Sequence, residues 1–230
     1  MRSKVVPITN VIRLAEACEA LLARAPGTPG MALCDSAAGL GKTTAIGWLA
    51  TRKHAVFVRA LSTSTATSLL DAISRELGME PARTLAAKVE AIVAELSRTG
   101  RPLFVDEADY VIGNHGQETR LQGALRDLHD LSDVPVVLVG MAGIEKRIKK
   151  FPQLAGRIAH RVEFKPATLA DAKLLAVQLA EVDIDPALVQ LLHARSCGNV
   201  RNFAVGLDKI EHKARKQGRS SFALEDWPRG

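Results

Sequence analysis

The sequence between residues 36 and 44 reads Ser36-Ala37-Ala38-Gly39-Leu40-Gly41-Lys42-Thr43-Thr44. An apolar run that starts at Met31 ends just before this stretch, and a helix-like segment follows from Ala45. Glycines let such a loop turn its backbone N–H groups inward, and the following helix presents its positive N-terminal end to an anion. The stretch therefore predicts a phosphate-binding loop between a strand and a helix.

The side chains at the end of this loop suit a nucleotide with a bound metal ion. Lys42 can reach the β- and γ-phosphates, and the hydroxyl of Thr43 can be a ligand of Mg²⁺. The P-loop pattern G-x-x-x-x-G-K-[ST] is met except at its first position, where Ser36 stands in place of glycine. A serine fits there if the backbone does not need a positive φ. We expect residues 36–44 to bind ATP with Mg²⁺.

Composition narrows the class of protein. The 230 residues are 47% hydrophobic, which is enough for a substantial core, and no apolar run approaches the roughly 20 residues of a membrane span. The basic start of the chain is not followed by the apolar segment of a signal peptide. Three scattered cysteines without a C-x-x-C pair fit a reducing compartment better than disulfides or a zinc site. We expect a cytoplasmic protein without membrane contact.

The charge balance indicates an anionic partner. Lys and Arg number 31 against 25 Asp and Glu, and the sequence pI is about 9.4. Aromatic residues are scarce at 4%, so stacking on single-stranded bases is less favoured than contact with duplex phosphates. A hydrated surface or an ordinary turn remains the alternative for each basic or hydroxyl-rich segment. The candidate DNA contacts are Arg59, Ser62, Thr63, Lys146, Arg147, Lys149, Lys150, Lys213, Arg215 and Lys216.

Hydrophobic patterning predicts strands that alternate with helices up to about residue 165. The expected strands cover residues 31–34, 54–59, 103–105, 134–139 and 161–164. Such alternation predicts an α/β fold with a parallel five-stranded sheet flanked by helices. From residue 168 onward only helical periodicity remains. We expect an N-terminal helix and linker (1–28), an α/β core (29–165) and a small all-helical lid with a basic C-terminal helix (166–230).

Two carboxylates follow the buried strand that ends at Val105. Ligands of open α/β sheets collect at the carboxyl ends of the strands, which is where Asp106 and Glu107 are expected. Asp106 can hold Mg²⁺, and Glu107 can orient and polarise the attacking water. An acidic pair after a strand is otherwise a helix N-cap, but the P-loop upstream favours the catalytic interpretation.

Two arginines complete the predicted site. Arg201 opens a helix of the lid in Gly198-Asn199-Val200-Arg201 and can reach back to the γ-phosphate. Arg157, in the segment Leu154–Ile158, is expected to face a neighbouring subunit, where it can stabilise the transferring phosphoryl group in trans. We therefore expect Lys42, Glu107 and Arg157 to act in catalysis.

These motifs together resemble the AAA+ ATPases, and in particular their DNA-transposition branch, which includes phage Mu transposition protein B and the Tn5053-type accessory ATPases. The P-loop and the Asp106-Glu107 pair are generic to many ATPases. The more particular segments are Val136–Met141, Leu154–Ile158 and Gly198–Arg201. The resemblance covers roughly residues 10–215.

The resemblance implies an ATP-dependent, non-specific duplex-DNA-binding protein. Such proteins assemble on DNA as a homo-oligomeric filament or ring, select the transposition target and activate a DDE-type transposase, and ATP hydrolysis disassembles them. In this chain Lys42 and Thr43 would bind phosphate and metal, Asp106 would hold the metal, and Glu107 would be the base. Arg157 would be the finger in trans and Arg201 the sensor in the lid.

One departure from the family pattern affects the expected rate. Many members place a polar side chain after the fourth core strand to position water, whereas this chain has Gly140-Met141 there. We therefore expect hydrolysis to be slow or to depend on assembly. Two alternatives stay open: a regulatory or secretion-associated AAA+ ATPase that acts on a protein partner, and a helicase-loader-like ATPase that favours single strands.

Overall fold

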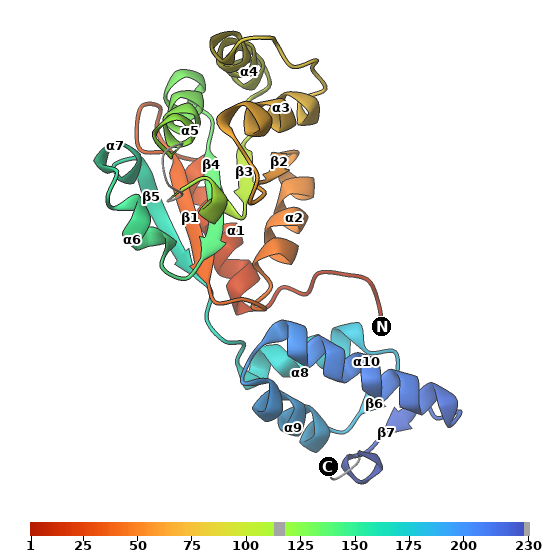
Figure 1. Cartoon of the computed structure of the whole chain (residues 1–230). Coiled ribbons are helices and arrows are strands. Elements are labelled where there is room, and N and C mark those ends of the chain that lie inside the picture. The colour runs from red at the N-terminus through yellow and green to blue at the C-terminus, as the bar shows by residue number, and fades with distance from the viewer. Residues whose placement is uncertain (113–117, 228–230) are drawn as a thin grey trace. The chain divides into compact units, whose positions relative to one another are not determined.

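A parallel sheet of five strands, in the order β2-β3-β4-β1-β5, organises the larger part of the molecule in this computed structural model (Figure 1). The structure describes residues 1–112 and 118–227. Every pairing in the sheet is parallel, so the carboxyl ends of all five strands meet at one edge. The strands are β1 (Met31–Ser36), β2 (Val56–Arg59), β3 (Leu103–Asp106), β4 (Val136–Met141) and β5 (Ile158–Glu163).

The predicted five-stranded parallel sheet is thus confirmed. Its central strands are near-continuous apolar runs because helices cover both faces, and every residue of β1 and β3 is buried. Strand β5 begins at Ile158, three residues before the predicted start at Arg161. That edge strand alternates between exposed and half-buried residues up to Val162, so its first half lacks the apolar run by which the inner strands are found.

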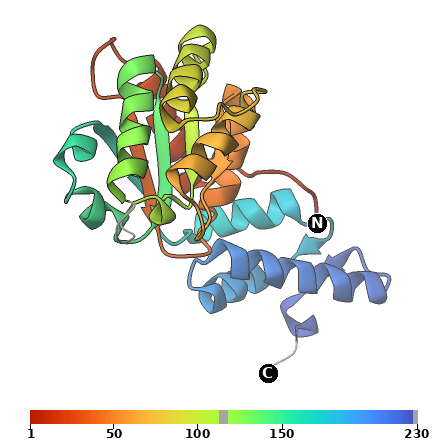
Figure 2. The same ribbon diagram turned by 45° about the horizontal axis from the view of Figure 1, so that its top comes forward.

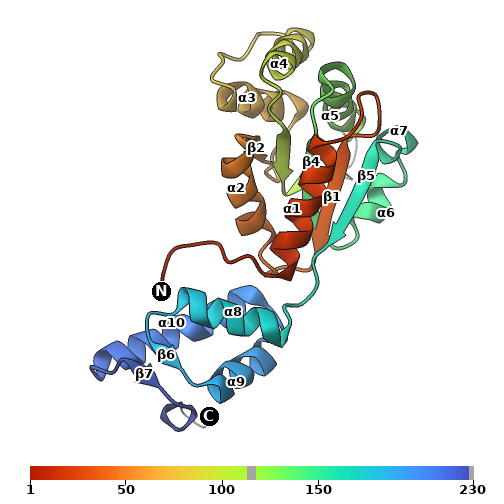
Figure 3. The same cartoon turned by 180° about the vertical axis from the view of Figure 1, so that it is seen from behind.

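The chain divides into two compact units. The sheet unit comprises Leu14–Ala37 and Lys42–Glu163, and the helical unit comprises Met1–Arg13, Ala38–Gly41 and Phe164–Gly230. Helix α1 (Thr9–Leu22) contributes to both, and its later part lies in front of the sheet in Figure 3. The other helices of the sheet unit are α2 (Lys42–Lys53), α3 (Ala66–Glu76), α4 (Leu85–Thr99), η1 (Ala108–Tyr110), α5 (Glu118–Ser132), α6 (Ile144–Ile148) and α7 (Pro152–Ala155).

The helical unit is built around α10 (Val200–Lys216), drawn as a long blue helix in Figure 2. Phe203, Leu207 and Ile210 lie on its buried face, as the period of 3.6 residues predicts. The remaining elements are α8 (Leu169–Leu179), β6 (Asp183–Ile184), α9 (Pro186–Ser196), β7 (Ser221–Phe222) and η2 (Leu224–Asp226).

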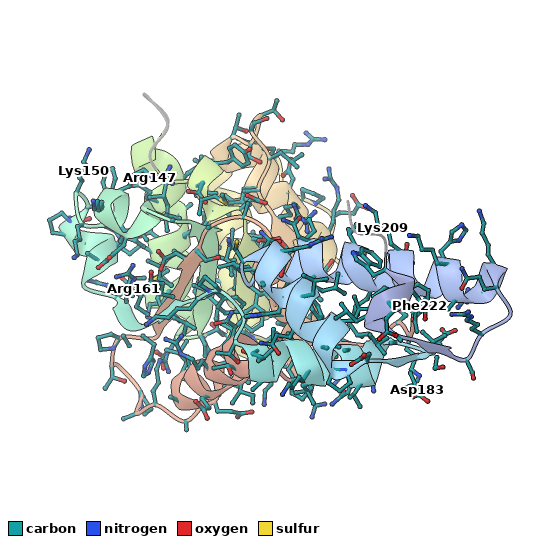
Figure 4. The ribbon with its side chains drawn as sticks, turned by 90° about the horizontal axis from the view of Figure 1, so that it is seen from below. Arg147, Lys150, Arg161, Asp183, Lys209 and Phe222 are labelled. Atoms are coloured by element: carbon teal, nitrogen blue, oxygen red, sulfur yellow. The ribbon has the colours of Figure 1, made fainter. Side chains whose placement is uncertain are left out.

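The helical unit also contains a small strand pair that periodicity did not predict. Asp183 pairs with Ser221 and Ile184 with Phe222, in parallel. Asp183 and Phe222 are labelled in Figure 4. Two residues are too few to show the alternation of a strand, so only the tertiary pairing reveals them. The side chain of Phe222 is buried, which anchors the segment after α10 to the unit.

Asp171 joins two segments of the helical unit through four hydrogen bonds. Its carboxylate accepts the backbone N–H and hydroxyl of Thr9 at 2.9 Å each, and the N–H and hydroxyl of Thr168 at 3.0 and 2.9 Å. The side chain is buried. Burial by itself raises the pKa of this carboxyl, but the hydrogen bonds outweigh it and hold the pKa below its ordinary value.

We expect Asp171→Asn to lower the free energy of unfolding by about 2 kcal/mol at pH 7, because an amide cannot accept all four bonds. A depressed pKa stabilises the fold above the unfolded value of about 3.9, and this stability is lost as pH falls through the folded pKa. Wild type should therefore lose more stability than the variant between pH 5 and pH 3. Urea unfolding at both pH values checks this, with Asp183→Asn as the exposed control.

Candidate functional site

The predicted phosphate-binding loop runs from the carboxyl end of β1 to the start of α2. Its two glycines have positive φ values, +82° at Gly39 and +90° at Gly41. Residues other than glycine rarely adopt these backbone angles, so both positions favour glycine for their backbone conformation alone. Ser36, at the first position of the pattern, belongs to strand β1 and keeps an extended backbone. Serine is therefore accommodated without left-handed strain.

The ammonium group of Lys42 is held by the first residues of this loop. Its Nζ donates to the backbone oxygen of Ser36 at 3.0 Å, to the Ser36 hydroxyl at 2.9 Å and to the oxygen of Ala37 at 3.0 Å. Burial lowers the pKa of Lys42, and the negative charges of Glu107 and Asp106 act in the opposite direction. The lysine and both carboxylates therefore share one electrostatic environment.

Asp106 and Glu107 lie where β3 ends, at the same edge of the sheet. The carboxylate of Asp106 is only 3% exposed, and its Oδ1 accepts the N–H of Glu107 at 3.0 Å. Glu107 has left-handed backbone angles, φ 55° and ψ 38°. A non-glycine residue in this region is strained, and such strain concentrates at functional sites. The left-handed residue ends the strand and starts η1, so the two carboxylates do not follow the alternation of a strand.

Arg59 contacts the site rather than solvent alone. It ends β2, and in the sheet register it lies beside Asp106 of β3. Its guanidinium group approaches Asp106 Oδ2 with Nη2 at 3.2 Å and Nε at 3.3 Å. Arg59 was a candidate for DNA contact, and in this structure its charge is paired with the carboxylate expected to hold the metal.

Asp109 is a further residue of this edge to which the sequence analysis gave no role. Its Oδ2 accepts the backbone N–H of Met141, at the end of β4, at 2.5 Å. Arg147 of α6 forms an ion pair with the same carboxylate and donates to the backbone oxygen of Ile112 at 3.1 Å. A Cβ on Gly140 would lie 2.6 Å from Asp109 Oδ2, so any larger residue there would displace the Asp109 carboxylate.

This network ties the segment after Glu107 to the end of β4. It also gives Arg147, a candidate DNA contact, an internal structural partner. A hint was present in the sequence, because Asp109 follows the Asp106-Glu107 pair by two residues. Its partners come from β4 and α6, which no local pattern could identify.

Arg157, predicted to act in catalysis, and Arg201, predicted to contact the nucleotide, have different surroundings. Arg157, just before β5, makes a two-point ion pair with Asp130 of α5, at 3.0 and 2.9 Å. This hydrogen-bonded pair lowers the pKa of Asp130. In the helical unit, Arg201 has an exposed side chain, while its backbone N–H donates to the oxygen of Gly39 at 3.0 Å.

The remaining candidate DNA contacts fall into two groups. Three of them contact other side chains: Lys149 pairs with Glu145, Arg215 pairs with Glu181, and Lys213 lies over the Trp227 ring at 5.1 Å. The others are exposed and have no ion-pair partner within the described residues: Ser62, Thr63, Lys146, Lys150 and Lys216. Figure 4 labels Arg147 and Lys150, which lie in and just after α6, and Lys209 of α10.

The residues of the sheet edge fit a nucleotide with its metal ion. Asp106 offers a buried oxygen ligand of the kind that Mg²⁺ prefers, and Thr43 places a hydroxyl in the first turn of α2. The two left-handed glycines give the loop the shape that phosphate cradles share. Lys42 already binds three oxygens, which is the coordination it would offer to phosphate oxygens.

Comparison with known proteins reveals the same fold elsewhere. The chain aligns with the Aeropyrum pernix ORC1 protein, solved in complex with DNA, at 20% identity and a TM-score of 0.67, over 98% of this chain and 64% of that one. It aligns with the ADPNP–ADP complexes of A. pernix ORC2 at 17% identity and a TM-score of 0.77, over 98% of this chain and 68% of that one. It aligns with the Thermotoga maritima RuvB Holliday junction branch migration motor at 20% identity and a TM-score of 0.64, over 96% of this chain and 67% of that one.

At these identities the likeness shows the shared fold, and the chain spans less than two thirds of the ORC1 structure. No curated protein matches the sequence. Among residues 1–112 and 118–227, no helix is both long and apolar enough to cross a membrane.

The AAA domain family model matches residues 24–148. Because this match spans more than half of the chain and includes the P-loop and the carboxylates of β3, the protein belongs to the AAA domain family of P-loop ATPases.

Proposed function

We propose that the protein is an ATP-dependent, non-specific duplex-DNA-binding ATPase of DNA transposition. In this proposal it assembles on DNA as a homo-oligomer, selects the target site and activates a DDE-type transposase, and ATP hydrolysis disassembles it. The observation that carries the proposal is the parallel sheet, in which the loop that leads to Lys42 follows β1 and the Asp106-Glu107 pair ends β3 at the same edge. The resemblance of its motifs to the transposition ATPases supplies the finer assignment.

The site residues take the following roles. Bound Mg-ATP supplies the phosphoryl group and the metal charge. Lys42 and the amides of residues 36–44 bind the phosphates, and Thr43 and Asp106 hold the metal. Glu107 orients water and accepts its proton. Arg157 of one subunit would neutralise charge at the site of its neighbour, and Arg201 would contact the γ-phosphate.

Two features support slow or assembly-dependent hydrolysis. At the end of β4, Met141 contributes no hydrogen-bonding side chain, and its backbone N–H is already bound by Asp109. Arg157 must leave Asp130 before it can act on another subunit. The two side chains are 39% and 30% exposed, and an ion pair this accessible to water is worth little, so assembly could break it readily.

DNA contact fits the exposed groups best. Arg59, Arg147, Lys149 and Arg215 are paired with carboxylates, so their charges are partly neutralised. The groups that keep their full capacity to bind phosphate are the exposed ones: Lys146, Lys150, Lys216 and the hydroxyls of the turn at residues 62–63.

We also propose the three-part division into residues 1–28, 29–165 and 166–230. A cytoplasmic location is proposed from the expected work on DNA and from the free thiols of Cys18, Cys34 and Cys197.

Arg59 provides a specific test of the metal site. Arg59 pairs with the carboxylate that would hold Mg²⁺, so we expect Arg59→Gln to lower the Mg²⁺ concentration for half-maximal ATP binding by about threefold. Titration of Mg²⁺ against a fluorescent ATP analogue measures this value. Arg75→Gln, at the exposed end of α3, is the matched control. An unchanged Mg²⁺ requirement in Arg59→Gln would place the metal away from Asp106.

The DNA-binding proposal is tested by fluorescence anisotropy of a labelled duplex. We expect binding with a slowly hydrolysed ATP analogue, much weaker binding without nucleotide, and a steep loss of affinity as salt rises. Electron microscopy of the same samples should show assemblies on DNA. Binding that ignores nucleotide, or a preference for single strands, would contradict the proposal. Recovery of a membrane assembly platform instead of a transposase from cells would favour the protein-partner alternative.

A further inference from the structure

Asn199 uses both ends of its side-chain amide within the helical unit. It is the N-cap of α10, where its Oδ1 accepts the backbone N–H of Asn202 at 3.0 Å. Its Nδ2 donates to the backbone oxygen of Ala38, in the P-loop, at 3.1 Å. The two neighbours fix the orientation of the amide, because an N–H needs an acceptor and a carbonyl oxygen needs a donor. One side chain thus joins two segments 161 residues apart in the chain.

A second contact runs beside the first. The backbone N–H of Arg201, one of the free donors in the first turn of α10, binds the oxygen of Gly39 at 3.0 Å. Gly39 lies so close to the cap that a Cβ would be 2.4 Å from Asn199 Nδ2. Glycine at position 39 is therefore required by its positive φ and also by the approach of Asn199. These contacts place residues 38–41 in the same compact unit as α10.

The two contacts determine which way the loop peptides face. In a trans peptide the C=O and the next N–H point in opposite directions. The oxygens of Ala38 and Gly39 point to the start of α10, so the N–H groups of Gly39 and Leu40 point away from it. A phosphate cradle needs this arrangement, with amides turned to the ligand and carbonyls satisfied on the other side.

We propose that Asn199 is a positioning residue, which holds the P-loop amides in their phosphate-binding orientation and couples nucleotide binding to α10. The role needs an acceptor for the cap and a donor for Ala38 in one short side chain. Aspartate and serine cap a helix as well as asparagine does, but aspartate has no donor and the serine hydroxyl ends short of the Nδ2 position. This inference rests on the proposed nucleotide binding at the P-loop.

The first test compares two capping substitutions at position 199. We expect Asn199→Asp and Asn199→Ser each to weaken binding of a fluorescent ATP analogue about tenfold, because each removes the Ala38 bond. Both should keep a thermal midpoint within about 2 °C of wild type, since the cap remains. Asp185→Asn, the matched change at the N-cap of α9, should leave affinity unchanged.

The neutral serine variant separates the missing donor from added charge. If only Asn199→Asp bound the ATP analogue more weakly, the negative charge of the aspartate would be repelling the phosphates, and the inference would be overturned. It would also be overturned if both variants bound the analogue as wild type does. If instead wild type and Lys42→Ala bound equally little nucleotide, the proposed function itself would fail.

The second test uses a reporter that does not depend on hydrolysis. Cys197 is exposed two residues before Asn199, whereas Cys18 and Cys34 are buried. We expect ATP to slow alkylation of Cys197 by a maleimide at least about threefold in wild type, because the bound nucleotide orders the loop and α10 together. The same nucleotide, at saturating concentration, should give no protection in Asn199→Ser. Equal protection in both proteins would overturn the coupling.

Discussion

Replacing Glu107 with glutamine is expected to slow ATP hydrolysis at least about 100-fold and to leave ATP affinity within about threefold of wild type. General-base catalysis contributes about 10² to 10⁴ to a rate, and an amide cannot accept the proton of water. Glutamine matches the size of glutamate, so the left-handed backbone at position 107 is disturbed as little as possible. Single-turnover hydrolysis and equilibrium binding measure the two quantities separately.

The control for this variant is Glu80→Gln, the same chemical change at an exposed position outside the site. It should hydrolyse ATP as wild type does. If hydrolysis drives disassembly, Glu107→Gln should also form DNA assemblies with ATP that persist as long as those formed with a slowly hydrolysed analogue. A Glu107→Gln protein that still turns over ATP at the wild-type rate would assign the base to another residue.

The sheet and the loop could be predicted because their signals are local. Strands β1, β3 and β4 are short apolar runs, and the spacing of Gly39, Gly41 and Lys42 is itself the signature of a phosphate loop. Asp106 and Glu107 then follow from their place after a buried strand. In each case the residues that carry the signal are neighbours in the chain, so no knowledge of distant contacts is needed.

The partners of the site residues could not be predicted in this way. Arg59 reaches Asp106 because β2 and β3 pair in one particular register, although the two residues are 47 positions apart. Asp109 is bound by Arg147, 38 positions later. A basic residue near an exposed loop therefore looks like a DNA contact in the sequence, while the folded sheet gives it a carboxylate partner.

Backbone conformation and long-range capping were also beyond the sequence patterns. Glutamate has no local preference for the left-handed angles of Glu107, which are imposed by the turn between β3 and η1. Asn199 could be recognised as a helix N-cap, but its bond to Ala38 follows only from the packing of the helical unit. The sequence thus identifies the chemical groups, and tertiary contacts decide how they are oriented.

Replacing Lys42 with alanine is expected to weaken ATP binding at least about 100-fold and to abolish ATP-dependent DNA binding. The ammonium group lies among the oxygens of residues 36–37, and its charge-assisted bonds to phosphate oxygens would be lost together. Two such bonds, at about 1.5 kcal/mol each, correspond to somewhat more than a 100-fold change in affinity. Isothermal calorimetry with an ATP analogue measures the loss directly.

Lys53→Ala is the matched control, because Lys53 lies in the last turn of the same helix and pairs only at the surface with Glu19. It should bind ATP and duplex DNA as wild type does. Since DNA binding is proposed to need nucleotide, Lys42→Ala should give the anisotropy of nucleotide-free wild type at every ATP concentration. Retention of ATP affinity within threefold by Lys42→Ala would mean that the phosphates bind elsewhere. If Lys42→Ala kept only the DNA binding that does not need nucleotide, that binding would be assigned to the exposed basic residues, without a contribution from the ATP site.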